Sequence, residues 1–261
     1  MYKVKFIRSY WGDLENFFRR HKDEIIDVSK KTKLNETVYV WGTYNYNFIK
    51  SLGFDCVLMS DKSTEYGNDY FYHSGKYMLH KLYAIKKGVQ DYGEVIFLDW
   101  DCEQIKDIDN RFYELLYEQN KTIQMPLYVY PKNYDEIIFE KWTNMPLKEK
   151  NYIMKQKEHL EKHNFDWIDS FVTPNAGFIY CSDEKVMDSL INLNDTLKIE
   201  IASEEMTFLE YAKENVKDLL GYITNYEPLV CNGKREDHFN QKELNDYISQ
   251  LIKKDLYFIH N

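Results

Sequence analysis

Two aspartates separated by one residue follow an apolar run and could bind a divalent cation. The run, Val-Ile-Phe-Leu at residues 95–98, leads into Asp99, Trp100 and Asp101. On an extended backbone, residues i and i+2 point to the same side, so Asp99 and Asp101 would face one cation while Trp100 turns away. Oxygen ligands of this kind suit Mg²⁺ or Mn²⁺, the ions that accompany a diphosphate. The triplet therefore predicts a metal site, although the same pattern is also common in solvated turns.

The elements before this triplet predict an α/β fold with a mostly parallel central sheet. Residues 95–98 are too apolar for a strand with one face in water and are typical of a central parallel strand. Apolar periodicity predicts earlier strands at residues 4–8, 37–41 and 56–59, and helices at residues 14–30, 45–52 and 75–87. We expect the helix at 75–87 to end at Gly88. Alternating strands and crossover helices build a doubly wound sheet, which binds ligands beyond the carboxyl ends of its strands.

The chain after Asp101 alternates less regularly. We expect a helix at residues 110–119, a strand at 123–130 interrupted at Pro126, and, within residues 171–180, a turn that runs into another apolar strand. Small residues at the start of that strand would let a ligand approach the backbone. Further helices are expected at residues 184–192, 204–214 and 241–252. A last strand at 256–259 leads to His260.

Composition excludes several classes of protein. The 261-residue chain has a formal net charge of -9, which disfavours a polyanionic partner such as nucleic acid. Its four cysteines are widely spaced without a C-x-x-C pair, so reduced core thiols are favoured over zinc ligands or disulfides. The first residues lack an apolar signal region, and no segment approaches the roughly 20 apolar residues of a membrane span. We therefore expect a cytoplasmic protein without a transmembrane segment, for which peripheral membrane contact stays open.

Several short motifs, taken in order, resemble the GT-A fold nucleotide-sugar glycosyltransferases, and particularly the glycogenin-like family eight and its bacterial capsule and lipopolysaccharide relatives. The apolar strand that ends on residues 99–101 is similar to the family's strand with its Asp-x-Asp motif. His-Lys-Leu at residues 80–82 resembles the helix position where the family places a lysine against the donor. Asn-Ala-Gly at residues 175–177 is similar to the turn that faces the donor sugar, and His260 resembles the late histidine that is the third metal ligand.

The resemblance implies a single GT-A domain that uses Mn²⁺ or Mg²⁺ and a UDP-sugar donor. Asp101 would ligate the metal directly, Asp99 could share that metal or accept a hydrogen bond from the donor ribose, and His260 would complete the protein ligands. A divalent ion stabilises the negative charge that develops on the leaving phosphate. Two departures are visible. The sequence has Glu-Glu at residues 204–205 where the family usually has Asp-Gln, and only Asn261 follows His260 where the family has a loop with Gly and Lys.

Other candidate residues come from the expected strand ends and turns. Tyr10 or Trp11, after the first strand, could stack on uracil, although core packing of Trp11 is a competing interpretation. The full set that we expect to bind the donor is Tyr10, Trp11, Asp61, Lys81, Asp99, Trp100, Asn175, Ala176 and Gly177.

The expected catalytic residues are Asp99, Asp101 and Glu205. Only an inverting enzyme would need a dedicated base, for which the conceivable carboxylates are Asp166, Asp169, Glu204 and Glu205. The resemblance favours retention of configuration instead.

The sequence therefore predicts a metal-dependent glycosyltransferase of the hexosyltransferase type. It would move a sugar from a nucleotide-diphosphate sugar to a hydroxyl of a glycan, a lipid-linked acceptor or a protein, as in polysaccharide biosynthesis. Residues 1–102 would form the nucleotide-binding half of one domain that covers residues 1–261, and residues 103–261 the half that binds sugar and acceptor. The alternatives are a nucleotidyltransferase, disfavoured because residues 8–12 hold one glycine instead of a glycine-rich phosphate loop, and a catalytically inactive nucleotide-sugar-binding protein of the same fold.

Overall fold

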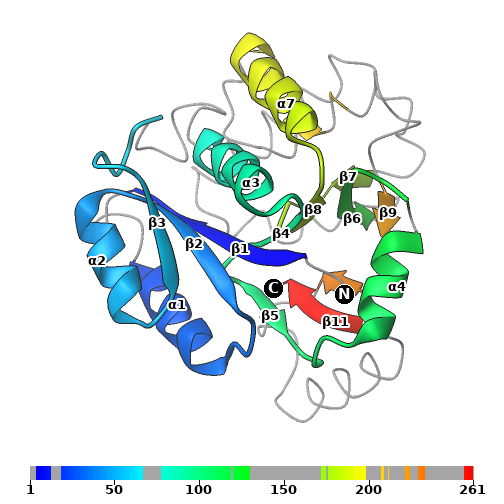
Figure 1. Cartoon of the computed structure of the whole chain (residues 1–261), viewed down its shortest axis with the longest axis horizontal. Coiled ribbons are helices and arrows are strands. Elements are labelled where there is room, and N and C mark those ends of the chain that lie inside the picture. Colours follow the sequence, from blue (N-terminus) through cyan, green and yellow to red (C-terminus); the bar gives the residue numbers. More distant parts are fainter. Residues whose placement is uncertain are drawn as a thin grey trace, which may run out of the picture.

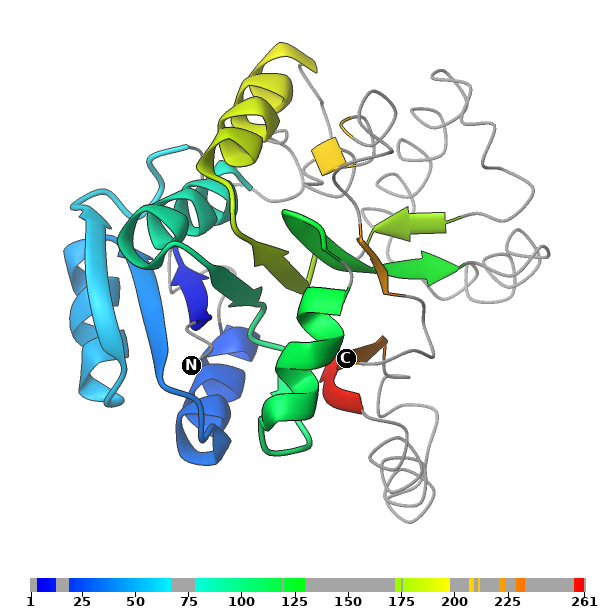
Figure 2. The same ribbon diagram turned by 45° about the vertical axis from the view of Figure 1, so that its right-hand side comes forward.

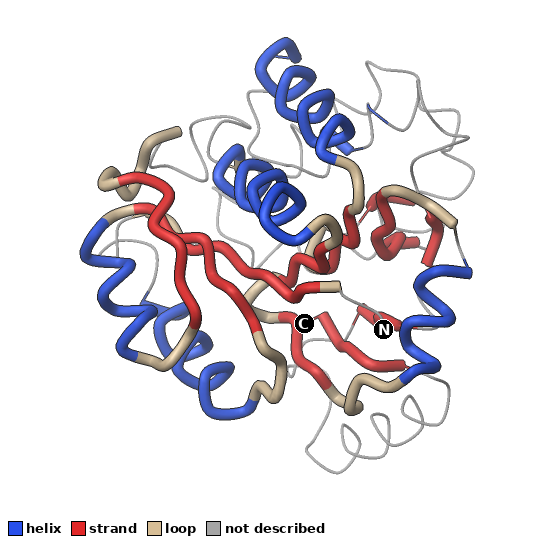
Figure 3. Tube along the Cα trace, viewed as in Figure 1, coloured by secondary structure: helices blue, strands red, loops and turns tan. Residues whose placement is uncertain are grey.

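Helices on both faces of a mostly parallel sheet form the part of the chain that the structure describes. The computed structural model describes residues 4–12, 19–66, 78–118, 120–129, 172–174, 176–197, 207–208, 211, 221–223, 229–232 and 256–260. Within these residues the main sheet has eight strands and a second sheet has three (Figures 1 and 3). The predicted α/β fold class is confirmed.

Four parallel strands form one half of the main sheet. They are β1 (Lys5–Tyr10), β2 (Glu36–Trp41), β3 (Asp55–Ser60) and β4 (Val95–Leu98), and they lie in the order β3-β2-β1-β4. The connecting helices are α1 (Arg19–Lys31), α2 (Thr43–Ser51) and α3 (Leu79–Tyr92). These strands and helices follow the alternation that the apolar pattern predicts.

Strands from the later part of the chain complete the main sheet and build the second one. β8 (Phe178–Cys181) pairs antiparallel with β4, and β6 (Ile123–Val129), β7 (Val172–Pro174) and β9 (Gly221–Ile223) follow it. The second sheet consists of β10 (Leu229–Asn232), β11 (Leu256–His260) and β5 (Cys102–Gln104). Because β5 directly follows the Asp-x-Asp triplet, one strand of the second sheet starts next to the predicted metal site.

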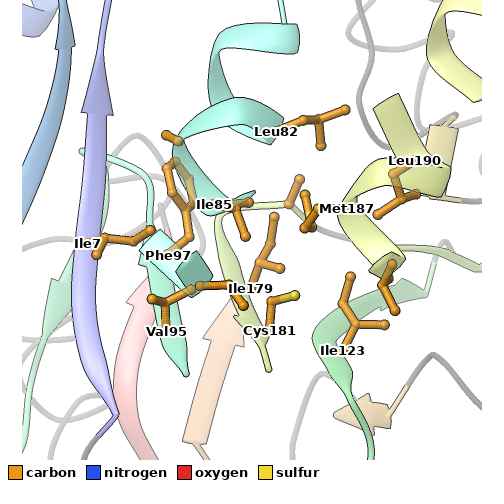
Figure 4. Close-up of a cluster of buried hydrophobic side chains, with 14 of the residues drawn as sticks. Ile7, Leu82, Ile85, Val95, Phe97, Ile123, Ile179, Cys181, Met187 and Leu190 are labelled. Atoms are coloured by element: carbon orange, nitrogen blue, oxygen red, sulfur yellow. The ribbon is translucent and has the colours of Figure 1, made fainter. Parts of the chain in front are cut away.

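The strand β4 is covered on both faces, as its apolar sequence predicts. Val95 and Phe97 belong to a core cluster that includes side chains of α3 and α7 (Glu184–Leu197), as Figure 4 shows. Ile96 and Leu98 belong to a second cluster, with side chains of α4 (Asn110–Glu118) and β11. Figure 2 shows α4 and β11 side by side on that face. Layers on both sides therefore hold β4 and orient the residues at its carboxyl end.

The helix α3 does not end at Gly88 as the sequence suggested, but continues to Tyr92 and is followed by Gly93 at φ +82°. A Cβ atom at Gly88 would lie 2.8 Å from Ile7 Cδ1 and 3.0 Å from Val95 Cγ1. The absence of a side chain at this position thus lets α3 approach the sheet closely. Within the described residues, no helix is long and apolar enough to cross a membrane.

Candidate functional site

The two aspartates lie in a turn at the carboxyl end of β4 and not on the strand itself. The strand ends at Leu98, and the Cys102 amide donates to the Asp99 carbonyl at 3.0 Å, which closes a four-residue turn. The Asp99 amide donates in its turn to the Gly177 carbonyl at 2.8 Å. The two carboxylates lie at the end of β4, where the sequence predicted them. The predicted cause of their orientation was wrong, because the geometry of the turn, and not the alternation of side chains along a strand, orients them.

Sheet pairing brings His260 to this turn from the far end of the chain. β11 pairs antiparallel with β5, and in this register His260 lies opposite Cys102. The His260 Nε2 atom is 3.1 Å from Asp101 Oδ1. One potential ligand atom from each of Asp99, Asp101 and His260 lies within 4.8 Å of the others. The structure thus brings together the three residues that the sequence predicted as ligands, and metal binding by them stays a prediction.

A glycine gives the His260 ring its place. A Cβ atom at Gly177 would lie 2.4 Å from His260 Cδ2 and 2.4 Å from His260 Nε2, closer than unbonded carbon and nitrogen atoms approach. Any side chain at residue 177 would therefore displace the ring or the turn. Gly177 thus has a steric role next to the candidate ligand, in addition to the hydrogen bond that its carbonyl accepts from the Asp99 amide.

Lys81 is a buried cation beside the two aspartates. It extends from α3, is 1% exposed, and places its Nζ atom 2.8 Å from Asp99 Oδ2 and 3.3 Å from the Ala176 carbonyl oxygen. The resemblance predicts a lysine against the donor at this position of the helix. The structure shows that it is buried and paired with the Asp-x-Asp turn.

Burial disfavours the charged forms of Asp101 and His260, but their contact reverses both effects. Burial raises the pKa of Asp101, and the hydrogen bond and charge of His260, with the charge of Lys81, outweigh it and lower this pKa overall. Burial lowers the pKa of His260, and the hydrogen bond to Asp101, with the charges of Asp101 and Asp99, raises it overall. The pair therefore favours a carboxylate beside a protonated imidazole, and a bound cation would replace that proton.

The chemistry of the three side chains fits a divalent cation. Two carboxylates and an imidazole are acceptable ligands for Mn²⁺, and the carboxylates alone suit Mg²⁺. The side chains of Asp99 and Asp101 are 30% and 41% exposed, so the turn is accessible to an incoming ligand. His260 is more enclosed, at 17%. These residues could therefore hold a metal on one side while its other positions accept ligand oxygens.

The sequence did not identify Arg8 and Glu36, which form a buried ion pair beside the turn. Arg8 on β1 is 2% exposed, and its Nη2 atom lies 3.0 Å from Oε1 of Glu36 on β2. Arg8 also donates to the Asp99 carbonyl through Nη1 and to the Cys102 carbonyl through Nη2 at 3.4 Å. An arginine in a strand that the pattern of elements places within the sheet is the signal that could have pointed to this pair, since buried charges need partners.

Trp100 points away from the carboxylates, as predicted, and packs against β1. Its indole nitrogen donates to the Ser9 carbonyl at 2.9 Å, and its ring lies 5.2 Å from the Arg8 guanidinium carbon. Phe54 contacts the same ring edge-on, with centroids 5.7 Å apart. Among the described contacts, Trp100 therefore holds the turn in place.

Of the two residues expected to stack on the base, Tyr10 is buried and Trp11 is partly buried. Tyr10 is 1% exposed, with Phe48 and Trp100 around its ring, so the structure does not offer this ring to a ligand. Trp11 is partly buried, and one face of its indole stacks on His80 with ring centroids 5.3 Å apart. The packing interpretation thus holds for that face of Trp11.

Asp61 lies beyond the end of β3 and is exposed. Its Oδ1 atom accepts a hydrogen bond from Thr43 Oγ1 at 3.0 Å. The remaining candidates, Asn175, Glu205, Asp166, Asp169 and Glu204, lie outside the described residues.

No family model matches the sequence, and no curated protein matches it. Solved structures similar to this chain include mouse xyloside xylosyltransferase 1, at 11% identity and a TM-score of 0.45 over 99% of this chain and 97% of that one. Glucosyl-3-phosphoglycerate synthase from Mycobacterium tuberculosis, in complex with Mn²⁺, UDP and phosphoglyceric acid, shows 11% identity and a TM-score of 0.42 over 97% and 77%. CMP:2-keto-3-deoxy-manno-octonic acid synthetase complexed with CTP shows 8% identity and a TM-score of 0.43 over 97% and 99%.

Proposed function

We propose that this protein is a metal-dependent glycosyltransferase of the GT-A kind, which transfers a sugar from a UDP-sugar to a hydroxyl acceptor. One observation carries the proposal: ligand atoms of Asp99, Asp101 and His260 lie within 4.8 Å of one another at the carboxyl end of a central strand. Ligands of open α/β sheets bind at this end of the strands. Asp101 and His260 would hold the metal, and Asp99 would share it or bind the donor ribose.

A divalent ion bound there would stabilise the negative charge on the leaving diphosphate as a Lewis acid. Lys81 would add a second positive charge next to the same phosphates. Its ammonium group is already fixed by Asp99 and the Ala176 carbonyl, so little reorganisation is needed when charge develops. Electrostatic stabilisation and donor positioning would then supply most of the rate acceleration.

The donor would extend from this turn along the carboxyl ends of the parallel strands. Trp11 after β1 and Asp61 after β3 are the described candidates for contact with the nucleoside, whereas Ala176 and Gly177 would face the sugar. We further propose that residues 1–102 bind the nucleotide and residues 103–261 the sugar and acceptor, with Asn175 and Glu205 among the latter. The acceptor would be a glycan, lipid-linked or protein hydroxyl in the cytoplasm, with retention of configuration.

Donor hydrolysis tests the proposal without knowledge of the acceptor. We expect the purified protein to release UDP from one UDP-sugar when Mn²⁺ or Mg²⁺ is present. This release should stop when EDTA is added. Asp101→Asn should abolish the release, because it removes a charged ligand. Asp107→Asn is the matched control, since its exposed side chain pairs only with Lys33, at 2.9 Å, among the described contacts.

Three outcomes would contradict the proposal. Release that resists EDTA, or that persists in Asp101→Asn, would remove the metal site from the reaction. If no nucleotide raises the melting temperature, either with or without Mn²⁺, a nucleotide-sugar site would be excluded. Release of pyrophosphate from a nucleoside triphosphate, without UDP release from any sugar donor, would favour the nucleotidyltransferase instead.

A further inference from the structure

Arg8 is a buried cation that pairs with one carboxylate, that of Glu36. Its Nε and Nη2 atoms lie 3.1 Å and 3.0 Å from the two carboxylate oxygens of Glu36, a two-point contact. The side chain of Glu36 is fully buried, and that of Arg8 is 2% exposed. A buried ion pair has a large desolvation cost and is weak evidence for a stabilising role. The other contacts of Arg8 therefore indicate its role.

The remaining contacts of Arg8 go to the Asp-x-Asp turn. Nη1 donates to the carbonyl of Asp99, the first residue of the turn, and Nη2 approaches the carbonyl of Cys102, the last one, at 3.4 Å. The same Asp99 carbonyl accepts the Cys102 amide at 3.0 Å. One guanidinium group thus binds both ends of the turn that carries the two candidate ligands.

The central residue of the turn is held by the same strand. The Trp100 ring lies 5.2 Å from the Arg8 guanidinium carbon, and its indole nitrogen donates to the carbonyl of Ser9, next to Arg8 in β1. With Trp100 fixed on β1, the flanking carboxylates meet Lys81 and His260, at 2.8 Å and 3.1 Å.

We infer that Arg8 is a positioning residue for the metal site, an inference that rests on the proposed function. It acts through the backbone of residues 99–102, because its hydrogen bonds reach carbonyls there and not the carboxylates. Its charge is offset by Glu36, so its effect on the site is geometric more than electrostatic. Lysine could not replace it, because a point charge cannot bind a carboxylate at two points and two carbonyls at once.

The double variant Arg8→Met/Glu36→Leu tests this role. Replacement of a buried ion pair by apolar side chains of similar volume is often neutral for stability, so the fold is expected to persist. We expect Mn²⁺ affinity, measured with UDP present by the EPR signal of free Mn²⁺, to fall about 10-fold or more, the usual effect of losing a group that orients ligands. The Mn²⁺ concentration that half-saturates UDP-sugar hydrolysis should rise by the same factor, and excess Mn²⁺ should restore turnover.

Gln124→Met is the matched control. Gln124 is also buried and donates through Nε2 to a backbone carbonyl, that of Leu116, at 2.9 Å, but it lies on β6 and has no described contact with the turn. It should leave the Mn²⁺ affinity unchanged. Amide hydrogen exchange at residues 100–102 supplies a readout without metal: the double variant should exchange faster there than the wild type, and Gln124→Met should not.

The outcomes separate the inference from the function on which it rests. A folded double variant with wild-type Mn²⁺ affinity and wild-type exchange at residues 100–102 would overturn the positioning role. If the wild type binds no Mn²⁺, the proposed function fails, and hydrogen exchange alone still decides whether Arg8 fixes the turn. If the double variant does not fold, Arg8→Lys answers the same two measurements, with the same expected and contrary results.

Discussion

The His260 ring fills the space that a side chain at residue 177 would occupy: a Cβ atom at Gly177 would lie 2.4 Å from its Nε2 atom. The same Gly177 carbonyl accepts the Asp99 amide, so one residue contacts two of the three candidate ligands. The close approach explains why residue 177 is a glycine and not a residue with a side chain.

Gly177→Ala should weaken Mn²⁺ binding, because the added methyl group pushes His260 away from Asp101. Gly88→Ala is the control. Its Cβ atom would also clash, at 2.8 Å from Ile7 Cδ1, but this clash lies in the hydrophobic core and not at the candidate ligands. Overpacking of this kind costs about 1–3 kcal/mol, so both variants should lose stability in urea unfolding. Only Gly177→Ala should lose Mn²⁺ affinity in calorimetric titration. Equal affinities in the two variants would show that His260 is not a ligand.

Lys81→Met should reduce UDP-sugar hydrolysis about 100-fold, the scale of removing one preorganised donor to developing negative charge. Mn²⁺ should bind at least as tightly as to the wild type, because a cation 2.8 Å from Asp99 has been removed. Lys86→Met is the control, because Lys86 lies on the same helix and pairs with Asp188 instead. It should change neither the rate of hydrolysis nor the Mn²⁺ affinity. Loss of Mn²⁺ affinity in Lys81→Met would place the lysine in a purely structural role.

Trp11→Ala should weaken UDP binding, whereas Tyr10→Leu, which also removes an aromatic ring, should not. From the sequence, either residue was a candidate for stacking on uracil. Stacking of a base on an aromatic ring contributes about 1–3 kcal/mol, which corresponds to about 5- to 150-fold in affinity. Tyr10 is enclosed by Phe48 and Trp100, whereas Trp11 is partly buried and stacks on His80 by one face. Titration of UDP against each variant checks the difference, and an unchanged affinity in Trp11→Ala would exclude stacking.

Asp109→Ala should destabilise the fold by about 1 kcal/mol at pH 7, because Asp109 caps α4. Its Oδ1 atom accepts the Phe112 amide at 3.1 Å and the Tyr257 hydroxyl at 2.6 Å. The Tyr257 hydrogen bond is the largest cause that lowers the pKa of Asp109 below its usual 3.8. Burial opposes it, and the helix amides and the charge of Lys106 add to the lowering.

A pKa that is lower in the folded state adds stability above the unfolded pKa and loses it as pH falls through the folded one. The difference in unfolding free energy between wild type and Asp109→Ala should therefore shrink below about pH 4, as measured in urea. Asp107→Ala, which removes only an exposed ion pair with Lys33, should show a smaller effect at pH 7. A difference that grows on acidification would contradict the sign.

The local parts of the fold could be read from apolar spacing alone. The parallel strands, the helix that became α4, and the end of β4 at the Asp-x-Asp triplet all follow from patterns within about ten neighbouring residues. The sequence could not decide that α3 continues through Gly88, because a glycine that ends a helix and one that packs tightly on a sheet look the same.

The sequence by itself determined an α/β chain whose central strand delivers two carboxylates, with a lysine and a late histidine as candidate companions. Only the tertiary structure decided that His260 reaches Asp101, that Lys81 pairs with Asp99, and that Arg8 holds the turn. The physical reason is that hydrophobic periodicity acts between near neighbours and leaves a regular trace in the sequence. These polar contacts instead join separate elements: β1 with the turn, α3 with the turn, and β11 with the turn. The helix packing and the strand register that place them exist only once the sheets have formed.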